Sequence, residues 1–334
     1  MNTSRYIISV SSLSDALEVF SESGIKPERL YPFISAVGVR ASETALRAVR
    51  SLPCIERVMC NCRVRASDFS PSPQPAFSAA PLIKRKDSLS PDICVAVIDT
   101  GVSEHPDIAL FPSRIAAFAD FVGGKKTPYD DNGHGTAVAG VLCGSDLLRG
   151  GYLVRKHRRL KIAALKSLTA DGEGTAFDIL TAMQWVYSNR LRYGIRVVNM
   201  SLGCPYQGKN DPLCLGAKAL YESGVTVVAS AGNGALSGEG VLSPAISPFV
   251  IAVGGTDNGV RAPFSPESGT KPEVYAPAVD VPTLTADGGY TFVSGTSMAA
   301  PSVSADAAEI LTEHPDVSHV GLIRRLNDMR KLSL

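Results

Sequence analysis

The feature that most constrains the fold is a series of short apolar runs between residues 94 and 253. Such runs, without polar alternation, suit parallel strands that are buried on both faces. Helical patterns lie between several of them, which is the order of βαβ units. We expect strands at 94–98, 161–165, 197–200, 225–230 and 249–253, and helices at 135–142, 177–191 and 215–223. The sequence therefore predicts an α/β domain with a doubly wound, mostly parallel sheet and a functional site at the carboxyl ends of its strands.

The region before this series has a different order of elements. Strand and helix patterns over residues 1–66 read β-α-β-β-α-β, the split βαβ arrangement of small ferredoxin-like α+β domains. The elements are expected at 6–10, 13–23, two short strands within 30–39, 45–51 and 55–64. A Pro- and Ser-rich stretch follows, which disfavours regular structure. We divide the chain into a domain at 1–66, a linker and mature N-terminal segment at 67–91, and a larger domain at 92–334.

Composition excludes several classes of protein. The formal net charge is +1, so no overall field favours nucleic acid or an anionic membrane. No stretch approaches the ~18 apolar residues that a membrane span needs. The first 20 residues lack the layout of a secretory signal, which predicts a cytoplasmic protein. The alternative is a secreted protein whose leader has been removed.

The seven cysteines are an odd number, so at least one has no partner within a monomer. Cys60 and Cys62 have C-x-C spacing without a second ligand pair, which is weak evidence for a metal. Cys204 and Cys214 are spaced so that a disulfide would close a ten-residue loop, but spacing alone leaves that pairing open.

Two candidate catalytic residues stand at expected element boundaries. Asp99 directly follows the run 94–98, where rigid backbone can hold a carboxylate that orients an imidazole. His134 stands between Gly133 and Gly135 at the start of an expected helix, from which its ring can face a cleft. Taken singly, Asp99 also fits a turn residue and His134 a structural histidine.

Two further candidates stand at an expected helix start and just after an expected strand. Ser297 precedes a helix expected from about Met298, where free backbone N–H groups and the helix dipole favour an oxyanion. Asn233 follows the strand at 225–230 on a glycine-flanked loop, from which its amide can donate to that oxyanion. Taken singly, they also fit an N-cap serine and a turn asparagine.

The segments VAVIDTGV, DNGHGTAVAG, SAGN and SGTSMAAP together resemble, in this order and spacing, the subtilisin-like serine proteases (subtilases, peptidase family S8). The resemblance covers about residues 92–315. The chain order Asp, His, Ser differs from that of chymotrypsin-like enzymes and of α/β-hydrolases. Residues 295–299 also lack the last glycine of the hydrolase G-x-S-x-G pattern.

The resemblance implies a serine endopeptidase that works through an acyl-enzyme and needs no cofactor for its chemistry. Asp99, His134 and Ser297 would form the triad, and Asn233 would stabilise the oxyanion together with the Ser297 N–H. A peptide substrate would pair as an added strand with two backbone segments. Those substrate-binding segments are represented by Ser201, Leu202 and Gly203 on one side and by Gly172 and Gly174 on the other.

The N-terminal region resembles an inhibitor I9-type propeptide by its element order and its position before the catalytic motifs. It implies a monomeric zymogen in which this prodomain is a partner in cis: it aids folding and covers Ser297 with its C-terminal tail. Autoprocessing is then expected within 65–69. The alternative is an unrelated ferredoxin-like module.

The sequence departs from the family pattern where calcium is concerned. Asp107, in the segment HPDI, matches one calcium ligand of the family. The stretch 143–161 lacks the Asn-rich loop with which many subtilases bind calcium tightly, so a structural calcium ion is open but doubtful.

Two alternatives concern the role of the protein. A pseudoprotease that acts as a binding scaffold is disfavoured by the complete triad. Within the protease class, broad degradation and maturation of one partner peptide both fit. Gly234 leaves no charge next to Asn233, so a preference for a basic substrate residue is not evident there.

Overall fold

The computed structural model describes residues 3–67, 70–71, 93–109, 113–144 and 160–331. The expected linker at 67–91 lies almost wholly outside the described residues. In the described part of the chain, no helix is long and apolar enough to cross a bilayer.

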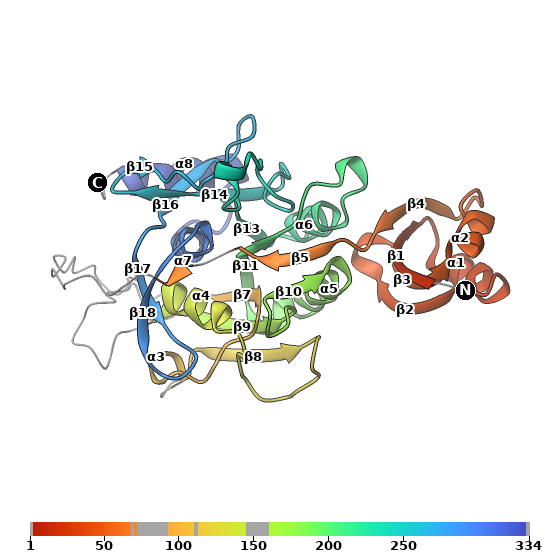
Figure 1. Ribbon diagram of the computed structural model, residues 1–334, viewed down its shortest axis with the longest axis horizontal. Coiled ribbons are helices and arrows are strands. Elements are labelled where there is room, and N and C mark those ends of the chain that lie inside the picture. Colours follow the sequence, from red (N-terminus) through yellow and green to blue (C-terminus); the bar gives the residue numbers. More distant parts are fainter. Residues whose placement is uncertain (1–2, 68–69, 72–92, 110–112, 145–159, 332–334) are drawn as a thin grey trace.

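The N-terminal unit is a four-stranded antiparallel sheet with two helices, in the element order that the sequence predicted (Figure 1). Its strand order is β2-β3-β1-β4. A core that includes Phe20, Val37 and Val39 fills the space between sheet and helices. The elements are β1 (Thr3–Val10), α1 (Leu13–Glu22), β2 (Lys26–Tyr31), β3 (Ala36–Ser42), α2 (Glu43–Val49) and β4 (Ile55–Cys60).

The strand expected at 55–64 is in fact two strands, and the second one leaves the N-terminal sheet. After β4 the chain crosses to the first turn of α5 (Ala176–Tyr193). The Cys62 carbonyl accepts from the Ala176 N–H at 2.9 Å, and Asn61 Oδ1 accepts from the Phe177 N–H at 2.9 Å. These bonds redirect the chain into β5 (Arg63–Ala66), which runs from the N-terminal unit toward α4 and α7 (Figure 1).

The N-terminal unit also packs on the side chain of Phe177. Tyr31 donates from its hydroxyl to the Phe177 carbonyl at 3.0 Å, and the two rings meet edge to face at 5.8 Å. A Cβ on Gly38 would lie 2.2 Å from the Phe177 ring, so only glycine allows this approach. The contact joins the small sheet to α5.

The second unit is built on an eight-stranded sheet in the order β15-β14-β13-β11-β7-β9-β8, with β16 beside β14. All its pairs are parallel except β14 with β15. The five predicted strands are present, whereas β8, a half-buried edge strand rich in alanine, was missed. The strands are β7 (Cys94–Asp99), β8 (Ile115–Asp120), β9 (Lys161–Lys166), β11 (Ile195–Met200), β13 (Thr226–Ser230), β14 (Val250–Asp257), β15 (Val260–Arg261) and β16 (Val274–Pro277).

Helices cover both faces of this sheet, which confirms the predicted doubly wound α/β architecture. Alternate residues of β7 belong to different cores: Ala96 and Ile98 pack with α5 and α6, and Val95 and Val97 pack with α4 and α7. The buried helix α4 and the N-terminal half of α7 begin near the carboxyl ends of the strands. The remaining elements named here are α4 (His134–Cys143), α6 (Pro212–Glu222), α7 (Thr296–Glu313), α8 (His319–Lys331), β17 (Val281–Leu284) and β18 (Tyr290–Ser294).

Candidate active site

Asp99 and His134 form a buried hydrogen-bonded pair. Asp99 is the last residue of β7 and His134 the first residue of α4. Their Oδ1 and Nδ1 atoms are 2.7 Å apart, and the side chains are 1% and 0% exposed. This geometry lets the carboxylate fix the orientation of the imidazole and stabilise its protonated form.

Gly133 and Gly135, on either side of His134, are each required for a different structural reason. Gly133 has φ +100°, a left-handed conformation that favours glycine. A Cβ on Gly135 would lie 2.0 Å from the Gly101 carbonyl, so the close approach of α4 to the end of β7 requires glycine. The pattern that singled out His134 in the sequence therefore reflects the backbone that delivers its ring to Asp99.

Asp130, which sequence analysis missed, links the two segments that carry this pair. Its Oδ1 accepts from Thr100 Oγ1 at 2.9 Å and from the Gly133 N–H at 2.8 Å. Its Oδ2 accepts from the N–H and the hydroxyl of Thr136. Thr100 Oγ1 in turn accepts from the Gly135 N–H at 2.9 Å. Asp130 stands three residues before the N-cap Gly133, outside the usual capping position, so no local sequence signal marked this role.

The pKa of His134 is raised by its surroundings. Burial lowers it, but the charge and hydrogen bond of Asp99, the charge of Asp130 and a hydrogen bond with the backbone of Ser67 outweigh burial. The raised pKa favours the protonated ring even though the site is buried. This suits a group that must accept a proton as the general base in acyl transfer.

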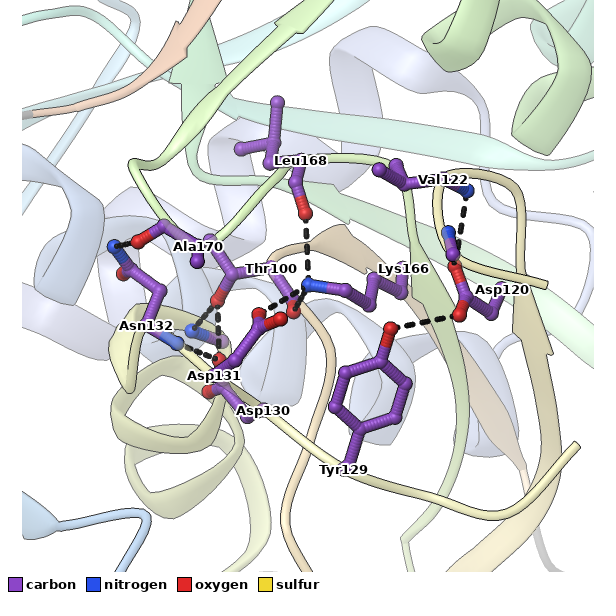
Figure 2. Close-up of polar contacts among 12 residues, drawn as sticks. Thr100, Asp120, Val122, Tyr129, Asp130, Asp131, Asn132, Lys166, Leu168 and Ala170 are labelled. Atoms are coloured by element: carbon purple, nitrogen blue, oxygen red, sulfur yellow. Dashed lines mark hydrogen bonds and ion pairs between the residues drawn. The ribbon is translucent and has the colours of Figure 1, made fainter. Parts of the chain in front are cut away.

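A second residue missed in the sequence, Lys166, supports the same region from β9 (Figure 2). Lys166 lies opposite Asp99 in the β7–β9 register and is 1% exposed. Its Nζ donates to the Thr100 carbonyl at 2.7 Å, to the Leu168 carbonyl at 2.9 Å and to Asp131 Oδ1 at 2.6 Å. Three acceptors match the three donors of an ammonium group, which ties the chain beyond Asp99 to the loop before His134.

Lys166→Met should lower the free energy of unfolding by about 2 to 6 kcal/mol, because two buried carbonyls lose a donor at ~1 to 3 kcal/mol each. The partly exposed Asp131 carboxylate would regain water and add little. Urea unfolding measures this. Lys161→Met, on the same strand, removes one donor from a half-buried position and should cost less than about 1.5 kcal/mol. Equal losses in the two variants would contradict a special role for Lys166.

Ser297 is the second residue of α7 and is fully buried. Its carbonyl accepts from Ser201 Oγ at 2.9 Å, and Ser201 Oγ accepts from Asn199 Nδ2 at 3.0 Å. Asn199 Oδ1 accepts from Ser304 Oγ at 2.9 Å, so both ends of this network lie on α7. Among the described residues, the Ser297 Oγ has no hydrogen-bond partner. The network fixes the first turn of α7 while this hydroxyl remains available.

Asn233 lies next to the start of the same helix. Its Oδ1 accepts from the Thr296 N–H at 2.9 Å, directly before Ser297. Because that bond engages the oxygen of the amide, the Nδ2 donor is the end that can serve another group. Asn233 also lines a cavity together with Ser67. The loop after β13 therefore brings an amide donor to the predicted nucleophile.

The predicted substrate-binding backbones lie on either side of the chain's own segment β5. Strand β10 (Glu173–Thr175) pairs antiparallel with β5 on one side, and β12 (Leu202–Gly203) pairs with it on the other. β5 is thus the middle strand of a three-stranded sheet. The predicted residues have these partners: Gly172 O accepts from Ala66 N, Gly174 is opposite Val64, Leu202 is opposite Ala66, Gly203 is opposite Arg65, and Ser201 O accepts from Ser67 N.

Beyond β5 the chain continues past the triad. Ser67 is buried, its Oγ lies 2.7 Å from Ser230 Oγ, and its N–H donates to the Ser201 carbonyl at 3.1 Å. After residues 68 and 69, which lie outside the described part, β6 (Ser70–Pro71) pairs with β18. Ser294, opposite Ser70, is three residues before Ser297. Ser67 and Ser70 are therefore held by segments that adjoin the predicted nucleophile, through Ser201 and the strand before α7.

A cavity of about 440 Å³ opens beside Ser67. Gly203, Gly234 and Leu242 are among its walls. A Cβ on Gly234 would lie 2.1 Å from Glu239 Oε2, so the carboxylate occupies the space that a side chain at 234 would need. The charge could not be predicted from Gly234 alone, because Glu239 reaches the cavity only through the turn that follows.

The metal and cysteine expectations have these outcomes. Most of the calcium-loop stretch 143–161, residues 145–159, lies outside the described residues. Where the chain is described, no group of three or more His, Cys, Asp or Glu side chains is arranged to hold a metal ion. None of the seven cysteines, all of which the structure describes, is joined in a disulfide. Cys204 lies against Cys62, with the sulfurs 3.3 Å apart, while Cys214 contacts the Ser243 hydroxyl.

Known proteins resemble both the sequence and the fold. Residues 90–328 match the sequence profile described as the subtilase family. Subtilisin DY of Bacillus licheniformis is 37% identical over 240 residues, covering 71% of this chain and 82% of the relative. Subtilisin amylosacchariticus of Bacillus subtilis subsp. amylosacchariticus is 32% identical over 335 residues, covering 96% of this chain and 84% of the relative.

A solved structure gives the same result. The crystal structure of a cold adapted subtilisin-like serine proteinase superposes with a TM-score of 0.62 at 30% identity, covering 75% of this chain and 87% of that chain. The parallel sheet, the order of the Asp, His and Ser motifs and these similarities all indicate the same family. The chain belongs to the subtilase family, peptidase family S8, and is a serine endopeptidase that acts on peptide or protein substrates.

Proposed function

We propose that the protein is a self-inhibited zymogen in which residues 1–66 are a ferredoxin-like, inhibitor I9-type propeptide. The observation that carries the proposal is the position of β5 between β10 and β12, the two backbones expected to bind substrate. The alignment with subtilisin amylosacchariticus covers 96% of this chain, so the likeness extends into the N-terminal unit. The propeptide would act in cis and leave the enzyme a monomer.

The proposed cleavage site is the Ser67–Asp68 bond, within the interval 65–69 expected from the sequence. Ser67 is the last described residue of the inserted segment, and its N–H donates to the Ser201 carbonyl at 3.1 Å. Residues before it bind as an added strand, and Ser70 pairs on the far side of the bond. This arrangement resembles a substrate that spans the catalytic residues.

In the proposed reaction, His134 takes the proton from Ser297 Oγ, which attacks the Ser67 carbonyl carbon. Asp99 holds the imidazole in the required tautomer through its 2.7 Å bond to Nδ1. Asn233 Nδ2 and the Ser297 N–H stabilise the oxyanion. His134 then protonates the departing Asp68 amine, and water hydrolyses the acyl-enzyme. The same residues would cleave other peptides once the N-terminal unit has left.

Incubation of the purified full chain should release a fragment that ends at Ser67 and a catalytic chain that begins at Asp68. Intact-mass measurement and N-terminal sequencing identify both products. Ala66→Pro, which removes the N–H that donates to Gly172, should slow this cleavage because one bond of the added strand is lost. A mature N-terminus outside 65–69, or a chain that stays intact while it cleaves added peptides, would refute the proposal.

A further inference from the structure

Two thiols lie in contact across the boundary between the N-terminal segment and the catalytic domain. Cys62 precedes β5, and Cys204 follows β12. Their sulfurs are 3.3 Å apart, although the residues are 142 positions apart in the sequence. Both residues belong to the same apolar core and are only 9% and 2% exposed. The contact is therefore a fixed feature of the packed interface.

Backbone hydrogen bonds hold each cysteine in position. The Cys62 carbonyl accepts from the Ala176 N–H at 2.9 Å. Cys204 exchanges two backbone bonds with Ser243, at 3.0 and 2.9 Å. A disulfide needs sulfurs ~2.04 Å apart, so the pair would have to close by only about 1.3 Å.

The contact also shifts the pKa values of the two thiols in opposite directions. The hydrogen bond between them lowers the pKa of Cys62, despite burial, and raises the pKa of Cys204. The thiolate is the attacking species in thiol–disulfide exchange, and Cys62, 9% exposed against 2% for Cys204, is the thiol that an added disulfide reaches first. By contrast, burial raises the pKa of Cys214 to about 12, which keeps it protonated.

We propose that Cys62 and Cys204 form a disulfide that keeps the N-terminal unit covalently attached to the catalytic domain. Its regulatory consequence rests on the proposed cleavage after Ser67. Cys62 lies before that bond and Cys204 after it, so the disulfide would be the remaining covalent link once the peptide bond is cut. This disulfide would make release of the N-terminal unit depend on a reductant.

The oxidant is a low-molecular-weight disulfide such as oxidised glutathione. The Cys62 thiolate attacks one sulfur of that disulfide and expels a glutathione thiolate. The Cys204 thiolate then attacks the Cys62 sulfur of the mixed disulfide and expels the second. Two protein thiols are oxidised to one disulfide, while one glutathione disulfide is reduced to two thiols. Because both protein sulfurs are buried, the exchange takes place as the chain folds or when β5 lifts transiently.

The first test does not depend on cleavage. Ser297→Ala in a Cys60→Ser background is refolded with oxidised glutathione and digested with trypsin without reductant. Trypsin places Cys62, Cys204 and Cys214 in three separate peptides, 58–63, 197–209 and 210–218. We expect a linked mass of 58–63 with 197–209 that disappears with dithiothreitol. A link between 197–209 and 210–218, or no link under oxidation, overturns the proposal.

The second test measures the consequence in the cleaved enzyme. After oxidation, the fragment ending at Ser67 should run with the catalytic chain on a non-reducing gel and separate only with dithiothreitol. Peptidase activity should rise at least about tenfold on reduction, since the tether holds the N-terminal unit at an effective concentration of about millimolar. Cys62→Ser should lose this response and Cys214→Ser should keep it. A response that survives Cys62→Ser overturns the switch.

The two tests separate failure of this inference from failure of the proposed function. A linked mass in Ser297→Ala supports the disulfide even if no fragment ever forms in the active enzyme. In that case the zymogen proposal is wrong, and so is the switch that rests on it. A fragment that forms without any linked mass supports the zymogen proposal and overturns the disulfide.

Discussion

Ser297→Ala is expected to lower kcat for peptide hydrolysis by about 10⁶-fold, the effect found for the nucleophile of subtilisin. The purified variant should also remain one chain from residue 1, because the residue proposed to cut after Ser67 is gone. The buried Ser297 Oγ has no partner among the described residues, so its loss should disturb the fold little. Activity on a peptide substrate and intact mass measure the two effects.

Ser302→Ala is the matched control, since it removes a hydroxyl from the same helix. Ser302 Oγ is a half-buried acceptor from Arg330 at 3.3 Å and lies more than one turn of α7 beyond Ser297. This control should be cut and should hydrolyse peptide like the wild type, to within about threefold. Cleavage at Ser67 in freshly purified Ser297→Ala, without added protease, would refute cleavage by this chain's own serine.

Asp99→Asn is expected to lower kcat by about 10⁴-fold, because the amide no longer enforces the tautomer or stabilises the imidazolium. A second effect should appear in the pH profile. Burial lowers the pKa of His134 and Asp99 raises it, so removing the charge should lower that pKa. The general base must be neutral, and activity rises as pH passes its pKa. The acidic limb of kcat/KM should therefore move to lower pH.

Asp131→Asn provides the control for Asp99→Asn. Asp131 is 43% exposed and keeps an oxygen acceptor for Lys166 after the change to Asn. We expect its kcat to stay within about tenfold of the wild type, with the acidic limb unmoved, since a single retained hydrogen bond carries most of its role. An acidic limb that does not move in Asp99→Asn would contradict the assignment of the limb to His134.

The sequence predicted the parts of the fold that depend on local pattern. The buried strands around Asp99 and Asn233 were found because continuous apolar runs identify strands covered on both faces. The split of 55–64 into β4 and β5 was missed, because residues 176 and 177, far away in sequence, supply the bonds that redirect the chain. The edge strand β8 was missed because its alanines and partial burial give no strong period.

The residues of the candidate site likewise include some that a local sequence pattern predicts and some that only the fold brings together. Asp99, His134, Ser297 and Asn233 could be predicted because glycines and element boundaries mark their positions along the chain. Lys166 was missed, because its three acceptors come from separate loops and only the folded β7–β9 register brings it opposite Asp99. The same holds for the contact of Cys62 with Cys204. Contacts between residues that are far apart in the chain produce no recognisable spacing in the sequence.

Labelling with a fluorophosphonate probe, followed by peptide mass spectrometry, tests the central claim most directly. The probe forms a covalent bond with a serine that a neighbouring base activates. In the cleaved wild-type enzyme we predict one phosphonylated residue, Ser297, with loss of peptidase activity in proportion to labelling. Ser297→Ala should take up no label. Active, cleaved protein that carries the label on another residue, or that loses no activity when Ser297 is labelled, would contradict the account.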